Sequence, residues 1–422
     1  MIDKNNIPQG YKNSPIGIIP QEWEVKKLKD ISKVLTGSTP STTDLSNYGS
    51  DYMFVSPVDM SENKKYIYKT EKMLSRKGYS ISRKMPIGSV LYTCIGSTIG
   101  KIGIASSELT SNQQINAIIC NEDNEFLYYV LLYNTGRIRK LAGEQAVPII
   151  KKSDFENLNF PIPPLAEQKK IAEILCTWDD AIEKQSKLIE KLELRKRGLM
   201  QRLLTGKIRL PGFTEPWKKI KLGEIGTFLS TNTLSRDKLN SNEGTIKNIH
   251  YGDILIKYAE IVNVSSVEIP FINKGVVVSS EYIENGDIVF ADTAEDYTVG
   301  KAIEIINVNG NKIVAGLHTM LFRPRTNIFV ECYLGYYINS EYYQCQLLPL
   351  TQGIKVCSIT KKGISQTKVL VPEKSEQKAI ASVLSAADKE IETQRKKLEA
   401  LRQQKRGLMQ QLLTGKTRVK VS

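Results

Sequence analysis

Two short patterns hold residue types that could do chemistry. Glu167-Gln-Lys169 has the Glu-x-Lys spacing of nuclease sites, but it lacks an upstream acidic partner and falls at the predicted start of a helix. A carboxylate there favours the positive end of the helix, so capping explains it better. Gly96-Ser-Thr-Ile-Gly100-Lys101 invites comparison with a phosphate-binding loop, but the spacing between its glycines is too short and Ile102 replaces the required hydroxyl residue. We expect a glycine-rich hairpin or bulge that presents Lys101.

Other catalytic or metal-binding signals are missing from the sequence. The six cysteines include no CxxC pair, and the chain has two histidines, so a structural zinc site is not expected. No methyltransferase cofactor loop, nuclease triad or nucleophile elbow is found, and we infer no catalysis. The absence of an N-terminal apolar segment and of an apolar run of spanning length fits a soluble cytoplasmic protein.

Length and charge indicate the class of protein. At 422 residues, the chain is expected to form two or more domains. Lys and Arg total 59 against 45 acidic residues, which gives a formal net charge of +14. Positive charge favours a polyanionic partner through long-range attraction and counterion release, although many basic proteins bind no nucleic acid.

Any site must be positioned by the secondary structure of the chain, and the clearest feature of that structure is a long segment that occurs twice in the sequence. Residues 167–207 recur as 376–416 without a gap, with roughly 24 of 41 positions identical. Each copy predicts a helix of about 39 residues, roughly 58 Å long. Key positions alternate at spacings of four and three, as in a coiled-coil seam. The predicted seam is Ile171, Leu175, Trp178, Ile182, Gln185, Ile189, Leu192, Lys196, Leu199 and Leu203, then Ile380, Leu384, Ala387, Ile391, Gln394, Leu398, Leu401, Lys405, Leu408 and Leu412.

Chain connectivity predicts how the copies pair. Only about ten residues separate Gly206 from Trp217, so the second globular region starts beside the end of the first helix and runs into the second. An exposed apolar stripe needs a partner, and antiparallel pairing of the two copies supplies it. The matching polar seam positions should cost stability but help to set the register. Heptads alone would also fit a dimerisation rod, but duplication of the whole unit favours a pseudo-twofold protein that suits a DNA duplex.

The predicted fold class is α+β, with two mixed α/β domains joined by two long antiparallel coiled-coil helices in a pseudo-twofold internal repeat. The globular domains are expected at residues 1–160 and 211–371, and the helical segments at 161–210 and 372–422. Buried strands are predicted at Ser89–Cys94 and Asp287–Ala291, and buried helices at Phe126–Tyr133 and Glu331–Ile338.

Several phrases resemble the specificity subunits of type I restriction-modification systems. The most telling are the paired Pro-x-x-x-Glu-Gln-Lys helix openings at Pro163 and Pro372. Each phrase is weak alone, but their order together with the duplication is a strong signal. The resemblance covers nearly the whole chain. The others are Ile16-Gly-Ile-Ile-Pro20-Gln-Glu-Trp23, Gly37-Ser-Thr-Pro40, Gly96-Ser-Thr-Ile-Gly100-Lys101, Asn112-Gln-Gln114, Asn285-Gly-Asp287-Ile, Gly300-Lys301 and Gly316-Leu-His318-Thr.

The resemblance implies a DNA-binding, non-catalytic subunit. Each globular domain would be a target recognition domain for half of a bipartite gapped DNA site, and the helices would act as a ruler and dock two modification (methyltransferase) subunits. S-adenosylmethionine, ATP and Mg would bind the partner modification and restriction subunits, and no cofactor is expected in this chain. A coiled-coil adaptor without sequence-specific DNA binding remains an alternative, and a stand-alone modification enzyme is a third.

Candidate DNA-contacting residues are polar and basic residues of predicted loops. A solvated surface charge is the competing interpretation for each of them, and the two histidines could equally be structural. The candidates are Lys64, Lys65, Tyr66, Arg76, Lys77, Arg83, Lys84 and Lys101 in the first domain, and Arg236, Lys238, Lys247, Asn248, His250, Tyr251, Lys257 and Lys301 in the second.

Overall fold

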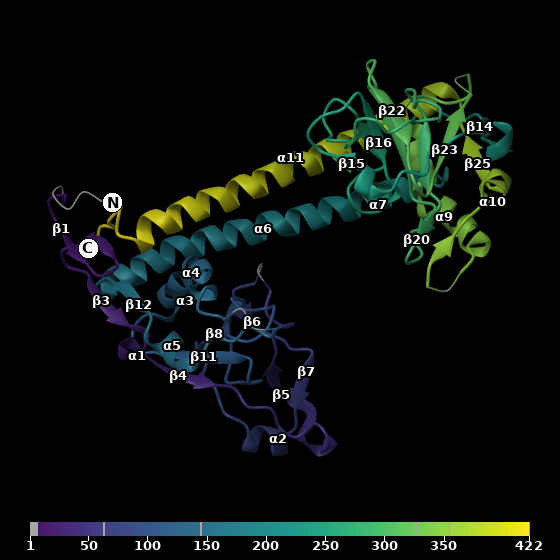
Figure 1. Ribbon diagram of the computed structural model, residues 1–422. Helices are drawn as coiled ribbons and strands as arrows, with labels where there is room; N and C mark the ends of the chain where they lie inside the picture. Colours follow the sequence, from purple (N-terminus) through teal and green to yellow (C-terminus); the bar gives the residue numbers. More distant parts are fainter. Residues whose placement is uncertain (1–6, 62–63, 144–145, 326, 354, 422) are drawn as a thin grey trace. The chain divides into compact units, whose positions relative to one another are not determined.

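The computed structural model describes residues 7–61, 64–143, 146–325, 327–353 and 355–421. The chain divides into two compact units, of which unit 1 comprises residues 1–186 and 396–422 and unit 2 comprises residues 187–395. The long helices α6 (Leu165–Leu203) and α11 (Lys374–Leu413) are labelled in Figure 1. Each helix continues from one unit into the other, so each unit contains a globular domain and a part of both helices.

Unit 1 is built on a five-stranded sheet in the order β4-β11-β8-β9-β6. Its central strands β8 (Val90–Thr93) and β9 (Ile102–Ala105) are buried along their whole length and pair antiparallel, which confirms the predicted strand and hairpin. The other elements are β1 (Tyr11–Ser14), β2 (Gly17–Pro20), β3 (Glu24–Lys27), α1 (Leu28–Ile31), β4 (Ser32–Thr36), η1 (Leu45–Asn47), β5 (Tyr48–Val55), β6 (Tyr66–Ile67), β7 (Lys72–Leu74), α2 (Arg76–Ile81), β10 (Thr110–Ser111), β11 (Ile115–Cys120), α3 (Asn124–Tyr133), α4 (Thr135–Arg139), α5 (Lys152–Glu156) and β12 (Asn159–Ile162).

Unit 2 repeats this sheet in the corresponding order β14-β23-β19-β21-β17. In both sheets the last strand pairs parallel with its neighbour, and the remaining pairs are antiparallel. Its elements are β13 (Lys218–Lys221), η2 (Leu222–Glu224), β14 (Gly226–Leu229), η3 (Arg236–Lys238), β15 (Leu239–Asn240), β16 (Ile246–Ile249), α7 (Tyr251–Ile256), β17 (Ile261–Asn263), β18 (Phe271–Ile272), β19 (Ile288–Ala291), β20 (Thr293–Ala294), β21 (Ala302–Ile306), β22 (Lys312–Ala315), β23 (Thr319–Pro324), α8 (Tyr333–Ile338), α9 (Glu341–Leu347), η4 (Leu348–Leu350), β24 (Cys357–Ser358), α10 (Lys361–Gln366) and β25 (Lys368–Val371).

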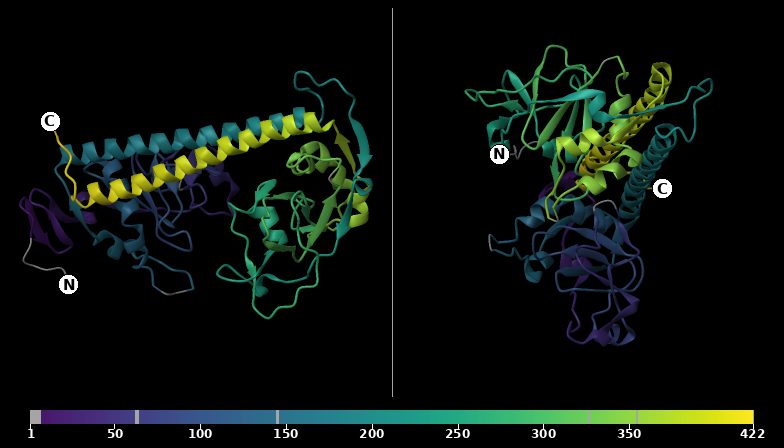
Figure 2. Two further views of the ribbon diagram at one scale, coloured as in Figure 1. Left: turned by 90° about the horizontal axis from the view of Figure 1, so that it is seen from above. Right: turned by 90° about the vertical axis from the view of Figure 1, so that its right-hand side faces the viewer.

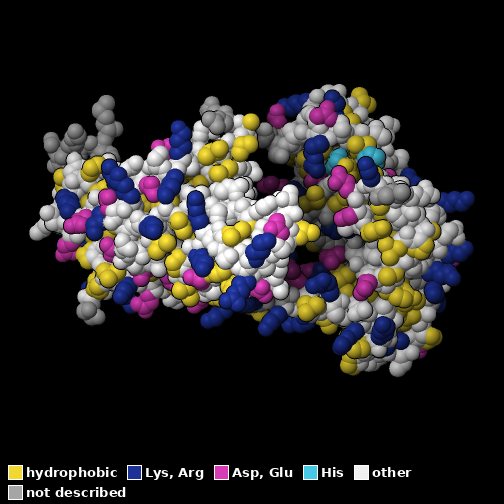
Figure 3. All heavy atoms as spheres, turned by 90° about the horizontal axis from the view of Figure 1, so that it is seen from below, with side chains coloured by type: hydrophobic (Ala, Val, Ile, Leu, Met, Phe, Trp, Pro, Cys, Tyr) yellow, Lys and Arg dark blue, Asp and Glu magenta, His cyan; other side chains and the backbone are white. Residues whose placement is uncertain are grey.

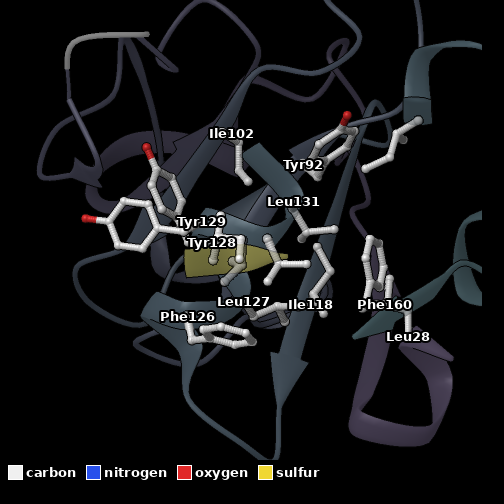
Figure 4. Close-up of a cluster of buried hydrophobic side chains, with 14 of the residues drawn as sticks. Leu28, Tyr92, Ile102, Ile118, Phe126, Leu127, Tyr128, Tyr129, Leu131 and Phe160 are labelled. Carbon is white, nitrogen blue, oxygen red and sulfur yellow. The ribbon is translucent and has the colours of Figure 1, made fainter. Parts of the chain in front are cut away.

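A buried helix packs against each central sheet, as the two apolar runs predict. In unit 1, side chains of α3 such as Phe126, Leu127 and Leu131 gather with Ile102 and Ile118 of the sheet (Figure 4). The tyrosine-rich helix α8 fills the same place in unit 2. These aromatic and aliphatic side chains supply the apolar area that stabilises each domain.

The ends of the long helices belong to the domain cores. Ile171 and Leu175 of α6 share the core of unit 1 with Met409 and Leu412 of α11, and α6 and α11 contribute to the core of unit 2 in the same way. Every predicted seam residue is buried or half-buried. The pairing of the two helices and the packing of the domain cores therefore depend on the same side chains.

The two helices pair antiparallel in each unit. In unit 2, Glu193 of α6 lies 2.5 Å from Arg395, whereas Arg195, further along α6, pairs with the earlier Glu390 of α11. Rising residue numbers on one helix thus face falling numbers on the other. Figure 2 shows α6 and α11 side by side in two further views. The predicted antiparallel pairing is confirmed.

The glutamate of each repeat opening lies in the first turn of its helix, as predicted, and it also binds side chains from two other segments. Glu167 is buried and accepts a 3.0 Å hydrogen bond from the Trp23 indole and two from the Arg418 guanidinium, at 2.7 and 2.9 Å. Glu376 accepts the equivalent bonds from Trp217 at 2.8 Å and from Arg209 at 2.6 and 2.8 Å. Each carboxylate therefore joins the start of one long helix to the first residues of a globular domain and to the segment that follows the other long helix, in addition to its place at the helix N-terminus.

We predict that Glu376→Gln lowers the free energy of unfolding by about 2 to 4 kcal/mol, because the variant leaves the Arg209 guanidinium without its carboxylate partner. Thermal or urea unfolding of the full chain measures this loss. Glu399→Gln is the matched control, since Glu399 forms an exposed pair with Arg406, and it should change the stability by less than about 0.5 kcal/mol. Equal effects of the two substitutions would contradict the structural role of Glu376.

Candidate nucleic-acid interface

Corresponding loops meet at one end of the central sheet in each unit. In unit 1 the loops after β4 and β8 lie beside the loop before β11, and in unit 2 the loops after β14 and β19 lie beside the loop before β23. We call these groups loop face 1, which comprises Gly37–Pro40, Cys94–Gly96 and Asn112–Gln114, and loop face 2, which comprises Ser230–Asn232, Asp292–Ala294 and Gly316–His318.

Backbone hydrogen bonds hold loop face 1 together. Gly37 donates to the Ile115 carbonyl at 3.0 Å, and Cys94 donates to the Gln114 carbonyl at 2.8 Å. A Cβ atom at Gly37 would come within 2.1 Å of the Asn112 carbonyl oxygen, so the close approach requires glycine. The loop face carries Thr39 and Gln113, which are exposed and hydrogen-bonded to each other. These side chains can exchange their mutual bond for bonds to a base edge.

Loop face 2 is built on the same backbone plan with different side chains. Asn232 donates to the Ala315 carbonyl at 2.9 Å, and Asp292 donates to the His318 carbonyl at 3.1 Å. His318 is exposed and has a φ of 54°. The imidazole lies 3.3 Å from the hydroxyl of Thr293 and 3.4 Å from the carboxylate of Asp292. The two loop faces thus present different hydrogen-bonding groups at corresponding positions.

The two histidines form one aromatic cluster with Tyr251. The Tyr251 ring stands edge-on to His318 with ring centres 5.3 Å apart, and its centre is 4.6 Å from that of His250. The side chain of His250 accepts the Gly252 N–H at the start of α7, and burial and the neighbouring Arg236 lower its pKa. His250 is therefore structural, whereas His318 remains at the surface. Figure 3 shows the histidine side chains close together, with Lys and Arg side chains nearby.

Basic candidates lie close to both loop faces. Arg83 of unit 1 donates through its backbone to the Ser38 hydroxyl at 3.0 Å and through its side chain to the Thr36 carbonyl at 2.8 Å. Arg236 of unit 2 forms a two-pronged pair with Asp253, at 3.0 Å in both bonds, beside His250. The exposed candidates are Lys64, Arg76, Lys77, Arg83, Lys84, Arg236, Lys238 and Lys257, while Lys247 and Tyr251 are half-buried.

Several exposed cations, and the half-buried Lys247, already have contacts within their own unit. Lys77 pairs with Asp44 at 2.8 Å, and Lys238 pairs with Asp237 at 3.0 Å. The amine of Lys84 lies 4.8 Å from the centre of the Tyr79 ring, and that of Lys247 lies 5.6 Å from the centre of the Phe271 ring. Lys257 donates to the Glu268 carbonyl at 2.6 Å. Because these contacts are at the surface, the cations can exchange them for a phosphate at little cost.

Five of the predicted contact residues are directed into the protein. Lys101 donates to the Pro57 carbonyl at 2.8 Å, and Lys301 donates to the carbonyls of Leu255 and Tyr258 at 3.1 Å each. Burial lowers the pKa of Lys301. The structure therefore corrects the expectation that the glycine loop presents Lys101 outward. Lys65 and Tyr66 bind Glu125, and Lys65 also contacts Cys176 of α6, while Asn248 is fully buried behind Gly316.

The loop faces contain residues that the sequence candidates omitted. Thr39, Gln113, Gln114, Asn232 and Thr293 lie there, and the first three also belong to two of the phrases that carry the family resemblance. Their signal in the sequence was position rather than charge, because each follows or precedes a buried strand at the same end of the sheet. A search confined to basic residues could not find them.

The described residues offer no group of three or more His, Cys, Asp and Glu side chains that could hold a metal ion. All six cysteines are free thiols. Of the helices within the described ranges, none is long and apolar enough to cross a membrane.

Known proteins resemble this chain over nearly its whole length. A family model for the type I restriction modification DNA specificity domain matches residues 20–194 and again 214–403. The chain is 27% identical to the MjaVIII specificity subunit of Methanocaldococcus jannaschii, over 95% of this chain and 94% of that protein. It is 28% identical to the putative MjaX specificity subunit of the same organism, over 98% and 97%.

Solved structures share the fold. The S subunit of a type I system from M. genitalium superimposes with a TM-score of 0.53 and 16% identity, over 93% of this chain and 96% of that one. A chain from a study of complex assembly and conformational transition in the type I system gives a TM-score of 0.60 and 16% identity, over 94% and 99%. The duplicated domain, the paired helices and the two family matches agree, and the chain belongs to the type I restriction-modification DNA specificity family.

Proposed function

We propose that this chain is the specificity subunit of a type I restriction-modification complex and that each unit reads one half of a bipartite, gapped DNA site. The proposal rests mainly on the two loop faces. They lie at corresponding ends of the five-stranded sheets of the two units, and they differ in their side chains. A shared backbone plan with different readers is what an asymmetric two-part site requires.

In the proposed complex, the chain supplies recognition and its partners supply the chemistry. Double-stranded DNA is bound by the loop faces and the surrounding basic residues, and the net charge of +14 favours that partner. Two modification subunits dock on the chain and bind S-adenosylmethionine, and restriction subunits bring ATP and Mg in the full complex. We place the complex in the cytoplasm and assign no catalytic step to this chain.

The direct test is co-expression with a modification subunit, followed by sequencing of methylated adenines. The proposal requires one gapped motif whose methylation depends on this chain. An adaptor without sequence-specific DNA binding would instead leave methylation scattered or absent, and the assembled complex would bind the motif duplex no more tightly than a duplex of scrambled sequence.

Substitution of one reader should affect one half of the motif. Gln113→Ala removes an amide that can bind a base edge, and we expect a loss of about 1 to 3 kcal/mol in specific binding with relaxed sequence preference in one half-site. His318→Ala should relax the other half-site. The methylated motifs of both variants measure this directly, with Gln403→Ala on the exposed side of α11 as the control. Relaxation of the same half-site by both variants would refute the assignment of one reader to each half.

Removal of surface cations should change the salt dependence of binding. Arg76→Ala and Lys84→Ala are each expected to lower the slope of log K against log salt by about 1, if each side chain contacts one phosphate. Lys101→Met should leave that slope unchanged and lower the melting temperature, because the Lys101 amine is bonded to the Pro57 carbonyl. Fluorescence anisotropy of the assembled complex on a labelled duplex gives the slopes. If the Arg76 and Lys84 variants have the same slope as the wild type, these two residues do not belong to the interface.

Insertion into the helices should change the gap in the recognised site. One heptad inserted at the unit boundary in both helices, after Ser186 in α6 and after Arg395 in α11, adds about 10.5 Å to each helix, or roughly 3 base pairs of DNA. We expect both half-sites to be kept and the gap between them to widen by that amount in methylation sequencing. A heptad in α6 alone should destabilise the chain instead, since the two seams no longer match. An unchanged gap in the double insertion would rule out a ruler.

A further inference from the structure

Two seam positions carry lysine where a coiled coil ordinarily buries an apolar side chain. Lys196 of α6 and Lys405 of α11 occupy equivalent places in the repeat. Their side chains are only 10% and 11% exposed. A buried ammonium group must have partners, because burial without them costs several kcal/mol.

In unit 2 the partners of Lys196 come from the other helix and from the domain. Its amine lies 2.6 Å from the carboxylate of Asp388 on α11 and 2.8 Å from that of Glu260, just before β17. Tyr336 of α8 donates its hydroxyl to the same Asp388 at 2.6 Å, and its ring centre is 5.3 Å from the amine. Burial opposes the charge on Lys196, but the two carboxylates outweigh it and raise the pKa of the amine.

Unit 1 contains the same arrangement with the helices exchanged. Lys405 of α11 pairs with Asp179 of α6, and Tyr129 of α3 donates its hydroxyl to that aspartate. The Lys405 amine lies 5.1 Å from the centre of the Tyr129 ring. Figure 4 shows the Tyr129 hydroxyl pointing away from the apolar side chains of the core. Each lysine–aspartate–tyrosine triad therefore joins three separate elements, namely both long helices and the buried helix of the domain.

The surroundings of the two triads differ. In unit 1, Lys65 lies 3.3 Å from Glu125 and 3.0 Å from the thiol of Cys176. In unit 2, Glu260 takes the position of Lys65 at the same sheet edge, since its carbonyl accepts the Glu304 N–H as that of Lys65 accepts the Ile104 N–H. Lysine, aspartate and tyrosine thus recur, while the neighbouring charge is reversed between the units.

The energetics favour a geometric role over a stabilising one. Desolvation of a buried pair consumes most of its Coulombic attraction, so apolar residues of similar size often stabilise a protein equally well or better. A polar residue at a seam position, by contrast, penalises every register that separates it from its partner. The tyrosine extends that penalty to the position of the domain on the helices.

We propose that the two triads are positioning residues that hold each reading domain at one place along the helix pair and so keep the spacing of the two half-sites single-valued. The inference rests on the proposed function for its DNA consequence, but its structural part concerns each unit alone. It does not require the triad to contact DNA.

The test replaces both seam lysines by apolar residues in the full chain. Lys196→Met with Lys405→Met should lower the melting temperature, because the carboxylates of Asp388, Glu260 and Asp179 are left without their cation. The matched control is Lys191→Met with Lys397→Met, at exposed positions of the same helices. A second variant, Tyr129→Phe with Tyr336→Phe, removes only the hydroxyls that tie the domains to the aspartates, and Lys196→Arg with Lys405→Arg should restore wild-type behaviour in part.

Two readouts separate the structural claim from the proposed function. Spin labels attached through unnatural amino acids at the exposed Lys140 and Gln403, both in unit 1, report the domain-to-helix distance. We expect a single narrow distribution in the wild type and the control, and a broadened one in the methionine and phenylalanine variants. A distribution as narrow in the variants as in the wild type would overturn the proposal without any reference to DNA.

Methylation sequencing of the co-expressed complex then tests the consequence. The methionine variant should raise the share of methylated sites with an altered gap about tenfold, which corresponds to a loss of about 1.4 kcal/mol in discrimination. A single unchanged gap despite broadened distances would overturn the link between the triads and spacing. If the wild-type complex methylates no gapped motif, the proposed function itself fails, while the distance measurement still decides the structural claim.

Discussion

The antiparallel contact between α6 and α11 is the interaction on which the rest of the molecule depends. Neither helix could remain alone in water, since each buried seam side chain contributes about 1.5 to 3 kcal/mol that an isolated helix would lose. The contact also completes the domains, because Met409 and Leu412, near the end of the chain, lie in the same core as Trp23, near its beginning. Removing either helix would expose core residues of both units.

Polar contacts specify what the apolar seam leaves undetermined. A seam of leucine and isoleucine tolerates shifts along its length, because apolar packing has no directional preference. Glu167 and Glu376 bind both an arginine and a tryptophan from different segments, and these bonds fix where each domain begins relative to the helix ends. Stability and geometry are thus supplied largely by different residues in this protein.

The separation of stability from geometry also allows the side chains of the loop faces to vary while the backbone that supports them stays the same. The loop faces are held by backbone hydrogen bonds, so the side chains at Thr39, Gln113 and His318 can differ without disturbing the sheet beneath them. Directional groups on loops that a buried sheet positions are well suited to reading base edges. Methylation and cleavage are proposed to occur on partner subunits, so they require no residues of this chain.

Prediction from the sequence succeeded where the signal was periodic and failed where it depended on a distant partner. The heptad spacing located α6 and α11, and the apolar runs located α3, α8 and the central strands. Lys101 and Lys301 follow glycines in loops and resemble surface cations in the sequence, yet carbonyl groups of another segment hold their amines. Lys65 was misleading for the same reason, since Glu125 lies sixty residues away.

The sequence by itself determined the duplication, the two long helices, their antiparallel pairing and the mixed domain that precedes each helix, because repeats, periodicity and short connections can be read directly from the chain. Only the tertiary structure decided which polar side chains face solvent at the loop faces and which serve as internal ties. That choice depends on the partner that folding brings to each group. A lysine beside a carboxylate and a lysine beside water are the same letter in the sequence.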